Sequence, residues 1–339
     1  MDHFFCSEAC RQADEDIVGS ATHYSTYVLI ECPMPWAYDA FDSPKIPARL
    51  KSLIQAVKLA KLSVRFLLIT QNQRRNLDRL KLIVYEQVQE KFSDGYRGFE
   101  TEVEDLEQAA KVAEQHFFKA IRVEDYPLQT LQPSTSRDIL VCTHGSHDKC
   151  CAKYGNPFYN QATDMANELK MSEVRVWKSS HFGGHRFAPT AIHFPDGRYY
   201  GLLDATSFQS ILTQTGEMQH LQRVYRGWSI LPIEVQVLER KLMRHHGWHW
   251  FDYRVALQSI HYNPDKTEIQ TELAFKGKTG VIYLCEARLM KDESKTLKLI
   301  GSCNGNRPSE FVKYTVEAYN LRLICSEPEP FTTYAQKAS

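Results

Sequence analysis

Apolar side chains in the first third of the chain alternate between short continuous runs and stretches with helical spacing. Residues 26–32 form a run rich in β-branched and aromatic side chains, which ends at a proline-containing segment at 33–36. Residues 49–61 repeat apolar positions at the spacing of a helix. The elements expected in this part are strands over 26–32, 64–69, 81–85 and 98–103, and helices over 49–61 and 103–119.

A similar alternation follows residues 130–136, a stretch containing Pro, Ser and Thr that we interpret as a linker. The short apolar run at 138–141 predicts a strand that delivers Cys142 at its end. Asn156 followed by Pro157 is typical of a helix start, because Asn caps a first turn and proline is tolerated at its first position. The further elements expected here are a strand over 174–177, a hairpin around 195–197 and a helix over 207–213. We therefore expect a β-α-β-β-α core of the thioredoxin-like type.

The last third of the chain predicts one helix followed by an antiparallel meander, with a polar tail. The elements expected there are a helix over 234–244 and strands over 253–261, 268–276, 280–290 and 296–303. The fold class is thus α/β, and α+β over the whole chain. The predicted domains are an N-terminal α/β domain (1–136), a thioredoxin-like domain (137–220), a C-terminal α+β module (221–326) and a flexible tail (327–339).

Composition limits the partners that the chain is expected to have. The 339 residues carry 41 Lys and Arg against 41 Asp and Glu, so no excess of positive charge favours nucleic acid. No apolar run approaches the roughly 20 residues that span a bilayer, and the N-terminus lacks the pattern of a secretory signal. Nine cysteines without regular spacing fit reduced thiols or metal ligands better than disulfides. We therefore expect a cytoplasmic protein with no membrane or nucleic-acid partner.

Cysteine and histidine are concentrated between residues 138 and 188, in two groups about thirty residues apart. The first group holds Cys142 and Cys151, and the second holds His181 and His185 on either side of a glycine pair. Both groups follow predicted strands, and the carboxyl ends of neighbouring strands are where α/β sheets commonly bind ligands. Thiolate and imidazole donors suit zinc, copper and iron–sulfur centres, so the pattern predicts a metal site.

The donor types leave several interpretations open. Two thiolates and two imidazoles fit a binuclear iron–sulfur site, but a mononuclear zinc site uses the same donors. A cysteine nucleophile activated by a histidine is a third possibility, and buried structural thiols are a fourth. Cys150 lies next to Cys151 and competes with it for the same role. The remaining candidates are His144, His147 and Asp148 as outer partners, the pair Cys6 and Cys10 on one helical turn, and the histidines at 245, 246 and 249.

Residues 141–151 together with 180–185 closely resemble the sucrase/ferredoxin-like family, and the likeness extends over roughly residues 6–220. The resemblance implies that the domain at 137–220 is a thioredoxin-like ferredoxin carrying a [2Fe–2S] cluster. It also implies that Cys142, Cys151, His181 and His185 bind this cluster; we call them the four proposed ligands. Cys151 is preferred over Cys150 because the second cysteine of the family falls nine positions after the first.

The function that this resemblance implies is proton-coupled, one-electron transfer, because imidazole ligands raise the potential and can gain a proton on reduction. The chain would then be an electron carrier rather than an enzyme with its own substrate, and would need an unidentified redox partner protein as donor or acceptor. The alternatives are a zinc-bound structural or interaction module, and a cysteine-dependent reductase without metal.

Overall fold

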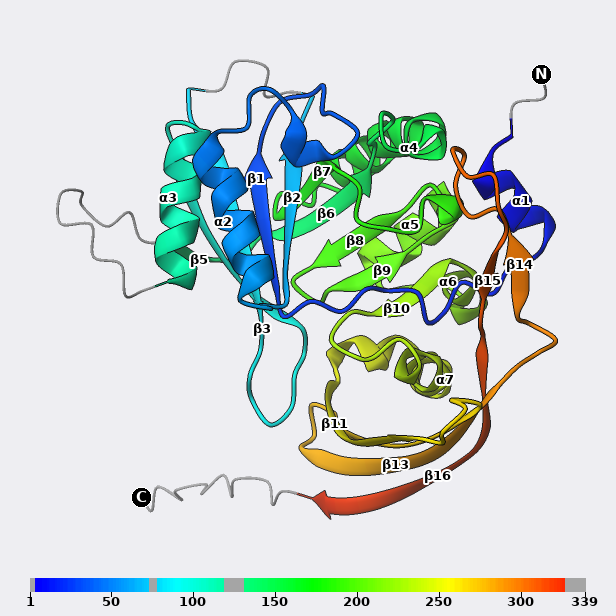
Figure 1. Cartoon of the computed structure of the whole chain (residues 1–339). Helices are drawn as coiled ribbons and strands as arrows, with labels where there is room; N and C mark the ends of the chain where they lie inside the picture. Colours follow the sequence, from blue (N-terminus) through cyan, green and yellow to red (C-terminus); the bar gives the residue numbers. More distant parts are fainter. Residues whose placement is uncertain (1–3, 73–77, 119–130, 327–339) are drawn as a thin grey trace, which may run out of the picture.

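The computed structural model describes residues 4–72, 78–118 and 131–326, and most strands of this part belong to one sheet of ten strands. Figure 1 shows this sheet in the upper part of the molecule and a curved sheet below it. Together they confirm the expected class, an α/β fold with a β-rich C-terminal module. In this part of the chain, no helix combines the length and the apolarity needed to cross a bilayer.

The first half of the large sheet follows the order that the apolar pattern predicts. Its elements are β1 (Thr26–Glu31), α2 (Ala48–Leu59), β2 (Val64–Thr70), β3 (Leu80–Gln87), β4 (Tyr96–Val103), α3 (Leu106–Phe117) and β5 (Gln132–Ser134). β1 and β2 are parallel, and β3, β4 and β5 continue antiparallel on the other side of β1. The segment interpreted as a linker therefore holds an edge strand, β5. Residues 1–3, 73–77 and 119–130 lie outside the described part.

The second half repeats the same arrangement. Its elements are β6 (Arg137–Cys142), α4 (Lys149–Glu168), β7 (Val174–Ser179), β8 (Ala191–Phe194), β9 (Arg198–Tyr200), α5 (Ala205–Thr213), α6 (Met218–Val224) and β10 (Tyr225–Trp228). β6 and β7 are parallel, and β8, β9 and β10 continue antiparallel beyond β6. This is the predicted β-α-β-β-α core with additional strands.

The two halves meet edge to edge, so the strand order reads the same outward from the centre: β10-β9-β8-β6-β7, then β2-β1-β3-β4-β5. At the junction β2 and β7 pair antiparallel through Ile69 with Ser179 and Thr70 with Lys178, the last residues of each strand. The carboxyl ends of both parallel strand pairs therefore converge near the middle of the molecule. The predicted division at residue 136 stays a prediction, since strands from both sides of it share one sheet.

The predicted start of α4 at Asn156 is wrong. The helix begins at Lys149, and the Asp148 side chain caps it by accepting the backbone N–H of Cys150 at 2.9 Å. Pro157 lies inside this helix. The earlier cap places Cys150 and Cys151 in the first turn of a helix rather than in a loop.

The C-terminal module wraps a curved four-stranded sheet around one helix (Figure 1). Its elements are α7 (Val235–His246), β11 (Arg254–Tyr262), β12 (Glu268–Lys276), β13 (Val281–Lys291) and β16 (Tyr314–Ser326). The predicted fourth strand at 296–303 is wrong, because β16 pairs with the whole of β13 and takes that place. Residues 297–299 instead form β14 (Leu297–Leu299), which pairs with β15 (Ser309–Phe311). The predicted tail, 327–339, lies outside the described residues.

A buried carboxylate ties this C-terminal segment to the N-terminal part of the chain. The carboxylate of Glu15 accepts two hydrogen bonds from Arg186, of 2.9 and 3.0 Å. It accepts a third, of 2.8 Å, from Lys313, which follows β15. Burial alone would raise the pKa of Glu15, but the hydrogen bonds and charges of Arg186 and Lys313 outweigh it and lower the pKa. The interactions of Glu15 with Arg186 and Lys313 therefore stabilise the folded state only while Glu15 is ionised.

Replacing Glu15 with Gln is expected to lower the free energy of unfolding by about 2–3 kcal/mol at pH 7, because two charge-assisted interactions are lost. Since the pKa of Glu15 is lowered in the folded state, the difference between wild type and variant should shrink as the pH falls below its usual value of 4.5. Urea unfolding of wild type and variant across pH 3–7 measures this difference in the free energy of unfolding. Glu293→Gln, at a side chain 72 % exposed, is the control. A difference that stays constant with pH would contradict the assignment.

Candidate metal centre

Three secondary-structure ends deliver donor side chains to one place in the second half of the sheet. Cys142 is the last residue of β6, and Cys151 lies in the first turn of α4. His181 follows β7 by two residues, and the backbone N–H of Ser180 donates to the carbonyl of Leu68 in β2 at 2.8 Å. The convergence follows from the parallel pairing of β6 and β7, which brings their carboxyl ends together.

Cys142, Cys151 and His181 form a compact group, with their two Sγ atoms and Nδ1 all within 4.8 Å of one another. Nδ1 of His181 lies 3.7 Å from the sulfur of Cys142 and 3.8 Å from that of Cys151. Both thiols are buried. Burial opposes ionisation of Cys142, but hydrogen bonds from Cys151 and from two backbone N–H groups lower its pKa, while the same contact and burial raise the pKa of Cys151. This group could hold a metal ion.

The His181 ring is neutral, and hydrogen bonds fix the loop that carries it. Burial and the neighbouring His147 and His185 rings lower its pKa to about 2, so its nitrogen lone pair is available as a donor. Its backbone N–H donates to Nδ1 of His144 at 3.2 Å, and Nε2 of His144 lies 2.7 Å from the carbonyl oxygen of Ala37. Because a carbonyl only accepts, Nε2 of His144 carries the proton. His144 therefore positions the loop and has no free nitrogen for a metal.

His185, the last of the four proposed ligands, lies beside this group rather than within it. It belongs to the short helix η2 (His185–Phe187), and its ring centroid is 5.2 Å from that of His181. Its Nδ1 lies 3.4 Å from the sulfur of Cys6 and 3.2 Å from Oδ2 of Asp148. The structure thus brings three of the four residues together and places the fourth between them and a second group.

The glycine pair between the two histidines accommodates a buried arginine. Arg226 donates to the carbonyl of Gly183 at 3.1 Å, and its guanidinium lies so close to Gly184 that a Cβ there would come within 2.6–2.7 Å of it. Gly184 also has φ of +79°, which side-chain-bearing residues rarely adopt. The pair therefore shapes the loop around a cation, whose pKa burial lowers to about 10.

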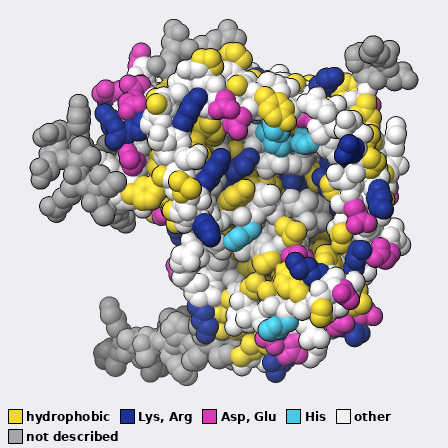
Figure 2. Space-filling model, in the orientation of Figure 1, with side chains coloured by type: hydrophobic (Ala, Val, Ile, Leu, Met, Phe, Trp, Pro, Cys, Tyr) yellow, Lys and Arg dark blue, Asp and Glu magenta, His cyan; other side chains and the backbone are white. Residues whose placement is uncertain are grey.

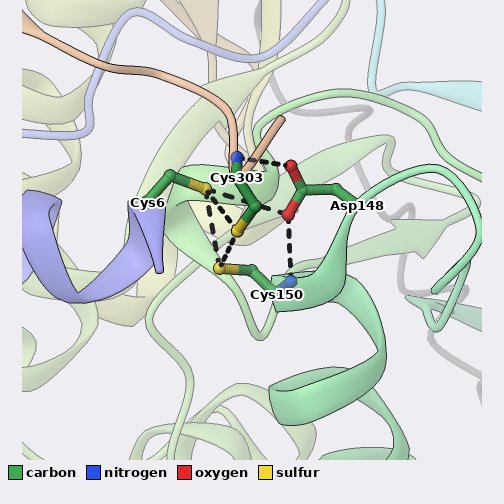
Figure 3. Close-up of side chains that lie close together, drawn as sticks. All are labelled: Cys6, Asp148, Cys150 and Cys303. Atoms are coloured by element: carbon green, nitrogen blue, oxygen red, sulfur yellow. Dashed lines mark hydrogen bonds between the residues drawn. The ribbon is translucent and has the colours of Figure 1, made fainter. Parts of the chain in front are cut away.

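A second group of donors lies on the other side of His185. Figure 3 shows Cys6 of α1 (Cys6–Gln12), Cys150 of α4 and Cys303 of the C-terminal segment pointing toward one another beside Asp148. Sequence reasoning named Cys6 and Cys150 as weak candidates and missed Cys303, which follows no motif. The other half of the predicted Cys6 pair, Cys10, packs instead with Ile17 and Phe187.

The first half of the sheet covers this centre with backbone carbonyls. The loop after β1 presents the carbonyls of residues 36–38, and Ser146, His144 and His147 lie within hydrogen-bond distance of them. The His147 ring stacks on His181, with centroids 4.0 Å apart, and on Tyr38, at 4.8 Å. Tyr38 is 61 % exposed, so a stack of three rings runs from the surface to His181. Figure 2 shows histidine side chains gathered at the surface in the upper part of the molecule.

The remaining candidates lie elsewhere. His246 stacks on Trp250 and packs against Tyr253 and Phe275, so it belongs to an aromatic cluster of the C-terminal module. A cleft of about 920 Å³ opens between the β3–β4 turn and that module. Its lining includes Arg97, Arg137 and Arg254 and none of the residues of either donor group.

Comparison with known proteins gives two matches. The sequence profile of a family described as sucrase/ferredoxin-like matches residues 17–227. The chain is also similar to altered inheritance of mitochondria protein 32 from Meyerozyma guilliermondii, with 30 % identity over 103 residues. This match covers 29 % of the chain and 36 % of the relative, so it spans about a third of that protein's length. No solved structure shows significant similarity to the chain.

Proposed function

Because the chain belongs to the sucrase/ferredoxin-like family, we propose that it is an electron-transfer protein with a [2Fe–2S] cluster bound by the four proposed ligands. One observation carries this proposal: two buried thiols and a neutral imidazole nitrogen meet within 4.8 Å at the ends of β6, β7 and the start of α4. Soft thiolate and imidazole donors are the chemistry that such a centre needs.

The donor set fits the cluster in type and in accessibility. Cys142 and Cys151 are 2 % and 1 % exposed, which keeps water from their sulfur atoms. His181 and His185 are partly exposed, and their rings are adjacent, so they would form the side nearer the surface. When bound, the cluster supplies a one-electron redox centre, and imidazole ligands raise its potential relative to an all-thiolate one.

Residues around the donors hold them in place. His144 receives the backbone N–H of His181, and Arg65 donates to the carbonyl of His181 at 2.6 Å. Oδ2 of Asp148 lies 3.2 Å from Nδ1 of His185, and its negative charge favours the tautomer with the proton on that nitrogen, which leaves the other ring nitrogen as the donor. Carboxylates in this position fix the tautomer and orientation of metal-bound histidines.

The proposed function needs a redox partner protein, and we propose that it docks at the face that carries the stack of Tyr38, His147 and His181. Aromatic rings in contact provide a short route for an electron between a surface and a buried centre, and Met34, 38 % exposed, adds an apolar side chain on the same loop as Tyr38. The partner of the proposed function would therefore contact the loop after β1.

The proposal is tested on full-length protein purified without oxygen. We expect about two iron and two sulfide per chain, visible absorption that fades on reduction, and an electron paramagnetic resonance signal after dithionite. A colourless protein without iron or signal, also after anaerobic reconstitution with iron and sulfide, would rule the proposal out.

The distances around His181 also support a second candidate, a mononuclear zinc site at the same donors. A tetrahedral zinc with Zn–S of about 2.3 Å and Zn–N of about 2.0 Å separates sulfur and nitrogen by roughly 3.5 Å. The separations of 3.7 and 3.8 Å in this group are close to that value. Zinc in iron-free protein that is lost in Cys142→Ser would establish this alternative.

A further inference from the structure

The second donor group has a geometry of its own that the four proposed ligands do not use. The sulfur of Cys150 lies 3.5 Å from that of Cys6 and 3.2 Å from that of Cys303, and the sulfurs of Cys303 and Cys6 are 3.7 Å apart. We propose that Cys6, Cys150 and Cys303, completed by Asp148, form a separate zinc site. This site does not depend on the cluster proposed above.

The sulfur triangle has the size of one face of a zinc coordination sphere. Zn–S bonds of about 2.3 Å place two sulfurs on one tetrahedral zinc roughly 3.8 Å apart, and the three edges measure 3.2, 3.5 and 3.7 Å. A disulfide would bring two of the sulfurs to about 2.05 Å. The thiols are thus too far apart to be bonded in pairs and close enough to share one ion.

Asp148 provides the fourth donor and is held in position by backbone groups. Its Oδ1 lies 3.9 Å from the sulfur of Cys6 and accepts the N–H of Cys150 at 2.9 Å. Its Oδ2 accepts the N–H of Cys303 at 3.0 Å and the hydroxyl of Ser302 at 3.1 Å. The two hydrogen bonds to Oδ2 occupy both of its lone pairs, but Oδ1 keeps one beside the sulfur of Cys6, so Oδ1 can complete a tetrahedron.

Local charge supports thiolates at this position. Cys150 lies in the first turn of α4, where the partial positive charge of the helix end favours an anion. The sulfur of Cys150 also accepts hydrogen bonds from the thiol of Cys6 and from the backbone N–H of Ser7, both at 3.5 Å. A zinc ion would displace the protons of the other two thiols, as metal binding does at cysteine sites.

The site would fasten together parts of the chain that are far apart in sequence. Cys6 and Cys150 are 144 residues apart, and Cys6 and Cys303 are 297 residues apart. Figure 1 shows the segment with β14 and β15 reaching from the lower sheet up to α1. The ion would thus hold the N-terminal helix, the first turn of α4 and the C-terminal segment against one another, with Asp148 touching His185 of the neighbouring centre.

The test measures zinc and iron separately in the full-length protein. Protein carrying Cys142→Ser, which removes the first donor group as a competing zinc site, is purified under reducing conditions and supplied with zinc alone. It is expected to bind one zinc per chain in competition with a chromogenic chelator, and adding Cys303→Ser should weaken this binding more than about 100-fold, since even residues behind the ligands change metal affinity by 10–100-fold. Cys303→Ser alone should keep the wild-type iron content.

Cys10→Ser is the matched control, because Cys10 is buried on the same helix as Cys6 but lies in a different cluster. Added to the Cys142→Ser protein, it should leave zinc binding unchanged. If Cys303→Ser fails to fold, X-ray absorption at the zinc edge of the Cys142→Ser protein replaces it, with three sulfur and one oxygen neighbour expected. No zinc in the Cys142→Ser protein, zinc retained after Cys303→Ser is added to it, or a disulfide between two of the three thiols in protein kept under reducing conditions would each overturn the proposal.

Discussion

Cys151→Ser is expected to lose nearly all iron and its visible colour, whereas Cys150→Ser keeps both. The two residues are neighbours in the first turn of α4, but consecutive positions of a helix are turned by about 100° from each other. Cys151 therefore faces His181, 3.8 Å from its Nδ1, and Cys150 faces Cys6 and Cys303. Adjacent thiols with the same chemistry serve different groups because of the helix that carries them.

Iron and sulfide analysis of anaerobically prepared variants measures this effect, with circular dichroism to confirm folding. Cys285→Ser is a suitable control, since Cys285 is buried in β13, distant in the fold from both groups. Iron that is retained in Cys151→Ser and lost in Cys150→Ser would transfer the ligand role to Cys150. The sequence alone leaves that choice to the family resemblance.

Glu239→Leu is expected to destabilise the protein by about 3–5 kcal/mol, since removing one partner leaves the other charge buried and unpaired. Oε1 of Glu239 in α7 accepts three hydrogen bonds, from Arg198 of β9 at 2.9 Å, from Tyr225 of β10 at 3.1 Å and from Trp250 at 2.7 Å. The side chains of Arg198 and Glu239 are 1 % and 0 % exposed. One carboxylate thus joins the edge of the large sheet to the C-terminal module.

Urea unfolding of wild type and variant gives the free-energy difference. Glu317→Leu tests an ion pair at the surface, where Arg288 and Glu317 are 49 % and 46 % exposed, and should change stability by no more than about 1 kcal/mol. Equal effects of the two substitutions would contradict the role assigned to Glu239. The comparison separates the effect of burial from that of charge.

Local patterns predicted most strands and helices because each pattern is set by neighbouring residues. The run at 26–32 became β1, and the strand expected at 268–276 became β12 with the same bounds. Pro157 misled the prediction of α4 because Asp148 supplies an earlier cap, and nothing in the local sequence ranks the two starts. The strand expected at 296–303 failed because β16, further along the chain, competes for the same edge of β13.

The candidate site was predictable only as far as its residues share a motif. Cys142, Cys151 and His181 follow strand ends or a helix start in one half of the sheet, so their meeting could be expected. Cys303 joins Cys6 through the long return of the C-terminal segment, a tertiary contact with no sequence signal. The orientation of His185 toward Asp148 depends in the same way on the path of η2.

The mirrored strand order of the large sheet places the donors and the loop that covers them in different halves of the sheet. The two halves of the sheet share one strand order, but Cys142, Cys151 and His181 all lie in the second half, and the first half contributes the loop whose residues 36–38 contact His144 and Ser146. Substitutions in that loop would change the surface around the rings of Tyr38 and His147 and leave Cys142, Cys151 and His181 in place. The donor residues and the surface loop with Tyr38 therefore lie in different halves of one sheet, so that the loop can change in sequence while the donors stay the same.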